Sequence, residues 1–238
     1  MQQFFDFPIT PLFSFDSFVA CDGTAAALQF ARRIADPADP ENLLYLYGPS
    51  GSGKTHLLKA IAHALAGEGR EPAACLSCGE LFTAEDLAAR FSGAPALLVD
   101  DLHLLADDAA LRAALWQVFN DFHDAGRKVA LAGHLPPREL PHLDDHLVSR
   151  LLWGLVARVD ASDDRSRRMI LKKIADDRQV RVPDEVVEYI LVTTGREVSE
   201  LIAGFETVYR LSMAEKRRIT LPLAREARQL QQSREKAP

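Results

Sequence analysis

Short apolar runs alternate with amphipathic segments from the beginning of the chain to about residue 160. The apolar runs cover residues 43–47, 73–77, 96–99, 129–132 and 155–159. Runs of this length, bounded by turn residues, are typical of strands that are buried on both faces of a sheet. Segments with apolar residues at helical spacing lie between them, notably residues 110–126. We therefore predict an α/β domain in which helices cover both faces of a five-stranded parallel sheet.

The pattern changes after Val159, where the strand-like runs stop. Residues 166–178, 183–194 and 198–216 carry apolar side chains at helical spacing and predict a small all-helical unit. From Arg225 onward the chain is basic and polar and is expected to fray. The expected organisation is a flexible N-terminal peptide (1–12), a base domain (13–160), a helical lid (161–230) and a disordered tail (231–238).

Composition narrows the class of protein. The 238 residues are 47% hydrophobic and 26% charged, and the formal net charge is -6. An acidic chain does not coat nucleic acid through a broad basic face, so we expect little direct DNA binding. No apolar stretch approaches the ~18 residues of a membrane span, and no signal-peptide pattern opens the chain. A cytoplasmic protein that does not contact membranes is expected.

Two patterns suggest a metal but favour simpler interpretations. Cys75 and Cys78 form a C-x-x-C, yet no second pair of Cys or His lies nearby to complete the four ligands of structural zinc. We expect Cys75 to end a strand and Cys78 to begin a loop. His142 and His146, with two aspartates between them, are spaced to share a ligand. An exposed acidic helix end is the more common origin of such a pattern.

The strongest chemical signal is the stretch GPSGSGKT, which lies between a predicted strand and a predicted helix. It matches G-x-x-x-x-G-K-[ST], whose glycines let successive backbone N–H groups point at a chain of phosphates. We predict a site for ADP or ATP with Mg²⁺, in which Lys54 reaches the phosphates and Thr55 offers its hydroxyl to the metal. The nucleotide-binding residues are Gly48, Pro49, Ser50, Gly51, Ser52, Gly53, Lys54 and Thr55.

An acidic pair follows the predicted strand in ALLVDDLHLL. A P-loop site needs a carboxylate at the end of a neighbouring strand to hold Mg²⁺ through its waters. Asp100 is the candidate for this role, together with Thr55. Asp101 is the candidate catalytic residue that polarises the attacking water.

These motifs, in this order, make the chain resemble the AAA+ ATPases and, within them, the DnaA initiator family. The resemblance covers residues 13–230 and implies a three-layer αβα AAA+ base followed by a helical lid. It rests on FSFDSFVACDGTAAALQFA (entry segment near the adenine), GSGKTHLLKAIAH (P-loop), LLVDDLHLL (Walker B strand), VALAGHLPPREL (sensor 1), HLVSRLLWGLVARV (arginine-finger region), IADDRQVRVPDEVVEYI and RRITLPLAREA (lid).

The resemblance also assigns roles to single residues. His56, directly after the P-loop threonine, joins the nucleotide-binding residues. Arg150 matches the arginine finger, which acts in trans on the nucleotide of a neighbouring subunit; the alternative is a salt bridge at the entry to a strand. His134 stands at sensor 1, where initiators usually place a different polar residue against the γ-phosphate.

The lid departs from the family pattern. Where initiators have an arginine in V-R-E-L, the sensor 2 position, this chain has Ser199 in V-S-E-L. Serine cannot neutralise a phosphate, and Arg196, one turn earlier, is a candidate substitute. We therefore expect the chain to bind nucleotide and to hydrolyse ATP weakly by itself, so whether it is an enzyme stays open.

The expected domain plan resembles one branch of the family. The sequence shows neither the DNA-reading helix-turn-helix domain nor the long N-terminal domain of initiators, which makes it similar to the Hda-type regulators. These bind the sliding clamp of DNA polymerase and promote hydrolysis of ATP on the DnaA initiator. Gln2, Phe5 and Phe7 resemble a clamp-binding peptide; the alternative is that the phenylalanines fold back on their own domain.

Three functions follow from these expectations. The first is a negative regulator of replication initiation whose partners are the DnaA initiator and the sliding clamp. The second is an ATPase that oligomerises on DNA or loads a helicase. The third is an adaptor stabilised by a structural nucleotide. A homo-oligomer is compatible with each of them.

Overall fold

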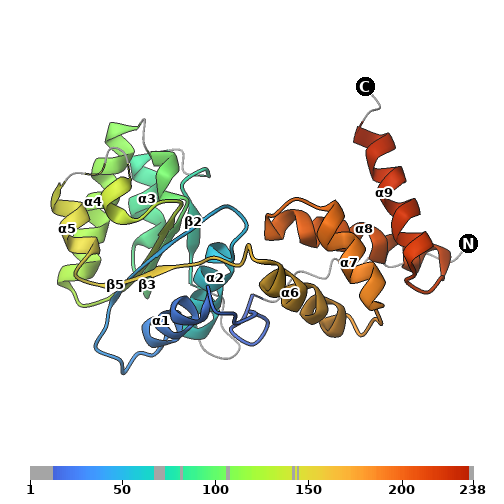
Figure 1. Cartoon of the computed structure of the whole chain (residues 1–238). Coiled ribbons are helices and arrows are strands. Elements are labelled where there is room, and N and C mark those ends of the chain that lie inside the picture. Colours follow the sequence, from blue (N-terminus) through green and yellow to red (C-terminus); the bar gives the residue numbers. More distant parts are fainter. Residues whose placement is uncertain are drawn as a thin grey trace, which may run out of the picture.

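The computed structural model describes residues 13–66, 73–80, 83–105, 108–140, 143 and 145–235. Its centre is a parallel sheet of five strands in the order β2-β3-β4-β1-β5 (Figure 1). The strands are β1 (Leu43–Tyr47), β2 (Cys75–Ser77), β3 (Ala96–Asp100), β4 (Lys128–Gly133) and β5 (Leu155–Arg158). Each predicted strand is confirmed: β1 has the predicted ends, and the ends of the other four differ by at most two residues.

Alternate residues of the strands fill two separate cores. On β1, Leu43 and Tyr45 belong to the core under α3 (Ala84–Phe91) and α4 (Ala109–Asp124). Leu44 and Leu46 belong to the core under α1 (Ala25–Ala35) and α2 (Lys54–Ala66). Because both faces are covered, the strands carry continuous apolar runs. The three-layer αβα prediction is therefore confirmed.

Three short helices complete the base. They are η1 (Leu102–Leu105), η2 (Pro137–Glu139) and α5 (Asp145–Leu151). The sequence predicted that Cys75 ends a strand, but in the structure it is the first residue of β2. Cys78 lies in the turn that follows the strand, as predicted. Burial raises the pKa of both thiols to about 12.

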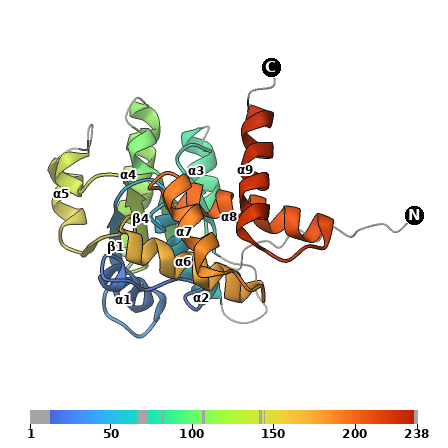
Figure 2. The ribbon, with the colours of Figure 1, turned by 45° about the vertical axis from the view of Figure 1, so that its right-hand side comes forward.

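The lid contains α6 (Asp164–Asp177), α7 (Asp184–Thr193), α8 (Val198–Glu215) and α9 (Leu221–Glu235). The first three match the predicted helices. The fourth is a correction, because the stretch from Arg225 to Glu235 was expected to fray and is helical. Leu223, Ala224 and Ala227 are buried in this helix, and the two alanines pack in the lid core. Figure 1 and Figure 2 both show α9 on the side of the lid farthest from the sheet.

A small apolar cluster joins the lid to the base. Cys21 of the entry segment, Ala161 of the connecting segment and Val198 of α8 are buried together, with Ile170 of α6 packed against them. The first turn of α8 is therefore held near the P-loop that precedes α2. Among the described residues, no helix is long and apolar enough to cross a membrane.

Candidate nucleotide-binding site

The P-loop runs from the end of β1 to the start of α2, and glycines set its path. Gly48 has φ +153 and Gly51 has φ +67, values that residues with a Cβ rarely adopt. A Cβ at Gly48 would lie 2.0 Å from the carbonyl oxygen of Val159. The loop can therefore pass close to the segment after β5 only because glycine occupies this position.

Lys54 is buried at the start of α2 and faces the loop. Its Nζ donates hydrogen bonds to the carbonyl oxygens of Gly48 at 2.9 Å and Pro49 at 2.8 Å. Burial lowers the pKa of Lys54, whereas the negative charges of Asp100, Asp101 and Glu197 act to raise it. The ammonium group is thus held inside the loop, where a phosphate chain would compete for it.

The hydroxyl of Ser52 supplies independent support for a ligand. It is buried and has no hydrogen-bond partner within the described part of the chain. A buried polar atom without a partner is costly, and a phosphate oxygen at this loop would satisfy it. The P-loop residues therefore fit the nucleotide that the sequence predicts.

The candidate metal-holding pair meets at the start of α2. Thr55 Oγ1 donates a 2.5 Å hydrogen bond to Asp100 Oδ2. The other carboxylate oxygen of Asp100, which is 2% exposed, accepts the N–H of Asp101 at 2.8 Å. A hydroxyl and a carboxylate in contact at this point fit the oxygen-ligand preference of Mg²⁺.

Asp101 adopts an unusual backbone conformation. Its φ is +57, in the left-handed region, and it directly follows β3. Its Oδ2 accepts a 2.9 Å hydrogen bond from Ser77 Oγ, at the end of the neighbouring strand β2. The carboxylate of Asp101 is therefore fixed beside the P-loop and not free in solvent.

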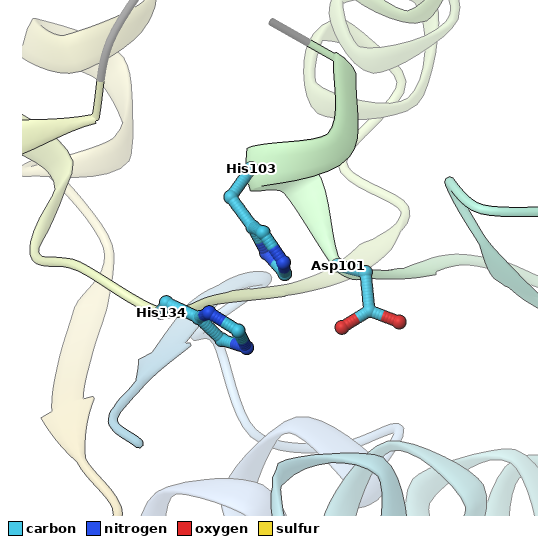
Figure 3. Close-up of side chains that lie close together, drawn as sticks. All are labelled: Asp101, His103 and His134. Atoms are coloured by element: carbon cyan, nitrogen blue, oxygen red, sulfur yellow. The ribbon is translucent and has the colours of Figure 1, made fainter. Parts of the chain in front are cut away.

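His134, the residue at the predicted sensor 1 position, follows β4 and lies near Asp101 (Figure 3). Its ring stacks on His103 of η1 with 3.6 Å between centroids. Burial lowers the pKa of His134, and the charges of His103 and Lys54 lower it further. His103 was not selected from the sequence, although it lies in the quoted motif LLVDDLHLL two residues after Asp101.

His56 binds the entry segment of the protein itself. Its Nε2 is 3.2 Å from Ser17 Oγ and 3.0 Å from the carbonyl oxygen of Ser14. Its ring makes edge contacts with Phe13 and Phe18, each at 5.2 Å between centroids. A Cβ on Gly53 would lie 2.9 Å from Phe18, so this segment also packs on the P-loop. His56 therefore fixes the entry segment against the start of α2.

The lid contacts the P-loop through the first turn of α8. A Cβ on Gly51 would lie 2.9 Å from Ser199 Oγ and 3.0 Å from the Ser199 nitrogen. Ser199 Oγ donates to Glu197 Oε2 at 3.1 Å. Arg196, the candidate substitute for the missing arginine, lines a hollow of about 300 Å³ on the lid together with Arg168, Glu188 and Val192.

Arg150 lies at a different end of the sheet. It is the penultimate residue of α5, which leads into the amino end of β5, whereas the P-loop follows the carboxyl end of the parallel neighbour β1. Arg150 donates to Asn120 Oδ1 and lies over the ring of Trp116 at 5.3 Å. None of the described partners of Arg150 is a carboxylate. The structure therefore does not contain the salt bridge that was the alternative interpretation of this residue.

Several predicted positions cannot be placed. Gln2, Phe5 and Phe7 lie outside the described residues, and so do His142 and Asp144. Of the remaining candidates, the structure brings together the P-loop, Asp100, Asp101, His134 and the lid residue Ser199. It does not bring Arg150 to this group.

Comparison with known proteins agrees with this architecture. A family model described as the bacterial DnaA ATPase domain matches residues 9–158, and one described as the Hda lid domain matches residues 164–227. Domain III of the Thermotoga maritima replication initiation protein DnaA has a TM-score of 0.77 at 23% identity, over 92% of this chain and 97% of that one.

Two further solved structures have the same fold. AMPPCP-bound DnaA from Aquifex aeolicus has a TM-score of 0.71 at 22% identity, over 85% of this chain and 66% of that one. The Thermotoga maritima RuvB Holliday junction branch migration motor has a TM-score of 0.70 at 22% identity, over 91% of this chain and 71% of that one.

Proposed function

Because this chain belongs to the bacterial DnaA ATPase-domain family, we propose that it is an Hda-type regulator of replication initiation. In this proposal it binds ADP or ATP and stimulates hydrolysis of the ATP held by the DnaA initiator. The observation that carries the proposal is the pairing of a DnaA-type base with an Hda-type lid whose serine lies against the P-loop.

The nucleotide has a defined set of candidate contacts. Lys54 would exchange the carbonyls of Gly48 and Pro49 for phosphate oxygens, and Ser52 would gain the partner that its buried hydroxyl lacks. Thr55 and Asp100 would hold Mg²⁺, which supplies positive charge to the phosphates. Phe18 and His56 keep the entry segment packed on the loop.

Weak hydrolysis by the chain itself follows from the lid. Ser199 offers no positive charge at the P-loop, and Glu197 beside it carries a negative one. A lid arginine makes charge-assisted hydrogen bonds to phosphate that serine cannot replace. The nucleotide would then have a mainly structural role, keeping base and lid in one orientation.

Arg150 is the candidate group that acts on the partner. It is part-buried on α5, held by Asn120 and Trp116, and near Trp153, whose side chain is 70% exposed. A large exposed aromatic beside an arginine is typical of a protein contact surface. Arginine fingers supplied in trans raise turnover by factors of roughly 10³–10⁵ in other NTPases.

Tethering to the sliding clamp rests on Gln2, Phe5 and Phe7. Two spaced phenylalanines in a short terminal segment can insert as apolar anchors into a pocket of a partner. Tethering would raise the local concentration of the regulator near newly replicated DNA.

The test is a hydrolysis assay with ATP preloaded on the cognate DnaA initiator. Full-length protein should accelerate hydrolysis in the presence of clamp and DNA, and removal of residues 1–8 should abolish both clamp binding and the acceleration. If the truncated chain still binds the clamp, the tethering role is wrong. If the chain alone turns over ATP and DNA stimulates it, an ATPase acting on DNA replaces the proposal. Clamp binding without any effect on initiator ATP would indicate the adaptor.

A further inference from the structure

Two imidazoles and one carboxylate converge beside the P-loop. Asp101 follows β3, His103 belongs to η1, and His134 follows β4. The three side chains come from neighbouring strand ends and point into one space, as Figure 3 shows. One ligand atom from each lies within 4.8 Å of those of the other two. Ligand atoms around one tetrahedral zinc ion lie about 3.4 Å apart, so rotations of these side chains would bring the three atoms onto one ion.

The hydrogen-bonding capacity of Asp101, His103 and His134 is not fully satisfied by the described part of the chain. Nδ1 of His103 is buried and has no hydrogen-bond partner among the described residues. The two rings stack at an interplanar angle of 22°. Each nitrogen lone pair lies in its ring plane, so an ion bound by both histidines would turn the rings out of this stack. A buried ring nitrogen without a partner is costly unless something else binds it.

Asp101 is oriented by a neighbour as metal ligands commonly are. Ser77 Oγ donates to Asp101 Oδ2, which fixes the carboxylate and leaves Oδ1 available. Hydrogen bonds of this kind orient ligands and are part of a working metal site. The left-handed backbone of Asp101, at φ +57, is a further cost that is common at functional sites.

Charge around the group permits a cation. The ammonium of Lys54, whose charge acts on His134, is already hydrogen-bonded to the carbonyl oxygens of Gly48 and Pro49. Asp100, with its own negative charge, also acts on His134.

We propose that Asp101, His103 and His134 bind one transition-metal ion of the Zn²⁺ class, separate from the Mg²⁺ site of Thr55 and Asp100. Two imidazoles favour Zn²⁺ and similar ions over Mg²⁺, which prefers oxygen ligands. Three protein ligands leave a further position open to water or to a phosphate oxygen. The site thus places a second cation at the acidic end of the nucleotide pocket.

The effect of this ion on nucleotide binding rests on the proposed function. A cation held by Asp101 and His134 supplies positive charge near Lys54 of the P-loop, to which the lid presents Ser199 in place of an arginine. We therefore expect Zn²⁺ to raise the affinity for ATP more than the affinity for ADP, because only ATP carries a γ-phosphate. Metal binding itself requires no nucleotide.

The first experiment titrates Zn²⁺ alone into the nucleotide-free full-length chain by calorimetry, in buffer that contains excess Mg²⁺. The native chain should bind a single ion. His103→Ala and His134→Ala should each weaken Zn²⁺ binding by more than about tenfold. His63→Ala, which removes an exposed histidine of α2, is the matched control and should leave binding unchanged. Unchanged binding in both site variants would overturn the proposal.

Two further variants keep the result interpretable. Asp101→Asn preserves shape and should also weaken Zn²⁺ binding, and thermal melts in chelator should show that each variant is folded. Co²⁺ supplies a spectroscopic probe, because imidazole coordination at low coordination number intensifies its visible absorption. Loss of binding in Cys75→Ser instead of the histidine variants would assign the ion to the thiols and contradict the site.

The outcomes separate the metal site from the function. If Zn²⁺ binds and the histidine variants lose it, the site stands even when the chain has no effect on initiator ATP. If the chain stimulates initiator ATP hydrolysis but binds no Zn²⁺ in any condition, the function stands and the site is wrong.

Discussion

Ser199 of the lid lies directly against Gly51 of the P-loop, so close that a Cβ on the glycine would be 2.9 Å from the serine hydroxyl. Through this contact the first turn of α8 packs against the P-loop. The lid therefore reaches the P-loop with a small neutral side chain, at the position where the sequence resemblance leads one to expect an arginine.

Ser199→Arg should tighten nucleotide binding. An arginine at this position would add one charge-assisted contact to phosphate, about 1–3 kcal/mol, or roughly a 5- to 150-fold lower Kd. Calorimetric titration with ATP would measure it. Ser199→Ala is the matched control and should bind as the native chain does. An arginine variant with unchanged affinity would show that the lid does not reach the phosphates.

Lys54→Ala should abolish nucleotide binding without unfolding the base. The ammonium is the buried cation of the loop, and its removal leaves the carbonyls of Gly48 and Pro49 without a donor. ATP with Mg²⁺ should raise the Tm of the native chain, since a ligand at 100 times its Kd stabilises by about 2.7 kcal/mol. The variant should show no rise. Lys173→Ala on the lid should keep the response; a full response in Lys54→Ala would refute the assignment.

Stability should fall as the pH drops below about 6.5, partly through His56. Burial lowers the pKa of His56 in the folded protein, so the neutral ring is favoured there. The contribution is complete above the unfolded pKa and is lost as pH falls toward the folded one. Denaturant unfolding at several pH values would measure the change. Aspartates with lowered pKa, such as Asp160 and Asp163, act only at lower pH, near 4 and below.

His56→Gln tests the origin of this dependence. Glutamine retains hydrogen-bonding capacity toward Ser17 and Ser14 but does not titrate, so the slope between about pH 6.5 and 5 should become shallower. The remaining slope belongs partly to His134, whose pKa is lowered as well. An unchanged slope in the glutamine variant would exclude His56 as a contributor.

Ala227→Asp should destabilise the lid. Ala227 is 1% exposed in the lid core, so a carboxylate there would be buried without a partner. We expect a loss of roughly 2–4 kcal/mol in the free energy of unfolding. Leu230→Asp, at a side chain that is 50% exposed on the same helix, is the control and should change little. Equal effects would mean that α9 is not packed as described.

Much of the fold was predictable because its signals are local. The strands are continuous apolar runs, since both faces of the sheet are covered, and the P-loop is defined by glycines whose backbone angles other residues avoid. The helix α9 was missed because its buried side chains are mostly alanines, which carry little hydrophobic signal among the polar residues of the tail.

The missed parts of the site depend on contacts between distant segments. His56 touches Ser14 and Phe13, and His103 meets His134 across two strand ends, which no spacing in the sequence encodes. Likewise, the guanidinium of Arg150 lies over the ring of Trp116 because α5 contacts α4. Such pairs become visible only when the order of strands in the sheet is known.

The most direct test of the account compares Arg150→Ala with Arg90→Ala, which removes an exposed arginine of α3 on the same base. ATP preloaded on the cognate DnaA initiator is followed through one turnover in the presence of sliding clamp and DNA. We predict that Arg150→Ala loses the acceleration, by a factor of roughly 10³ if the finger is fully used, while Arg90→Ala behaves as the native chain. Native acceleration by Arg150→Ala would contradict the proposal that Arg150 acts on the initiator's nucleotide.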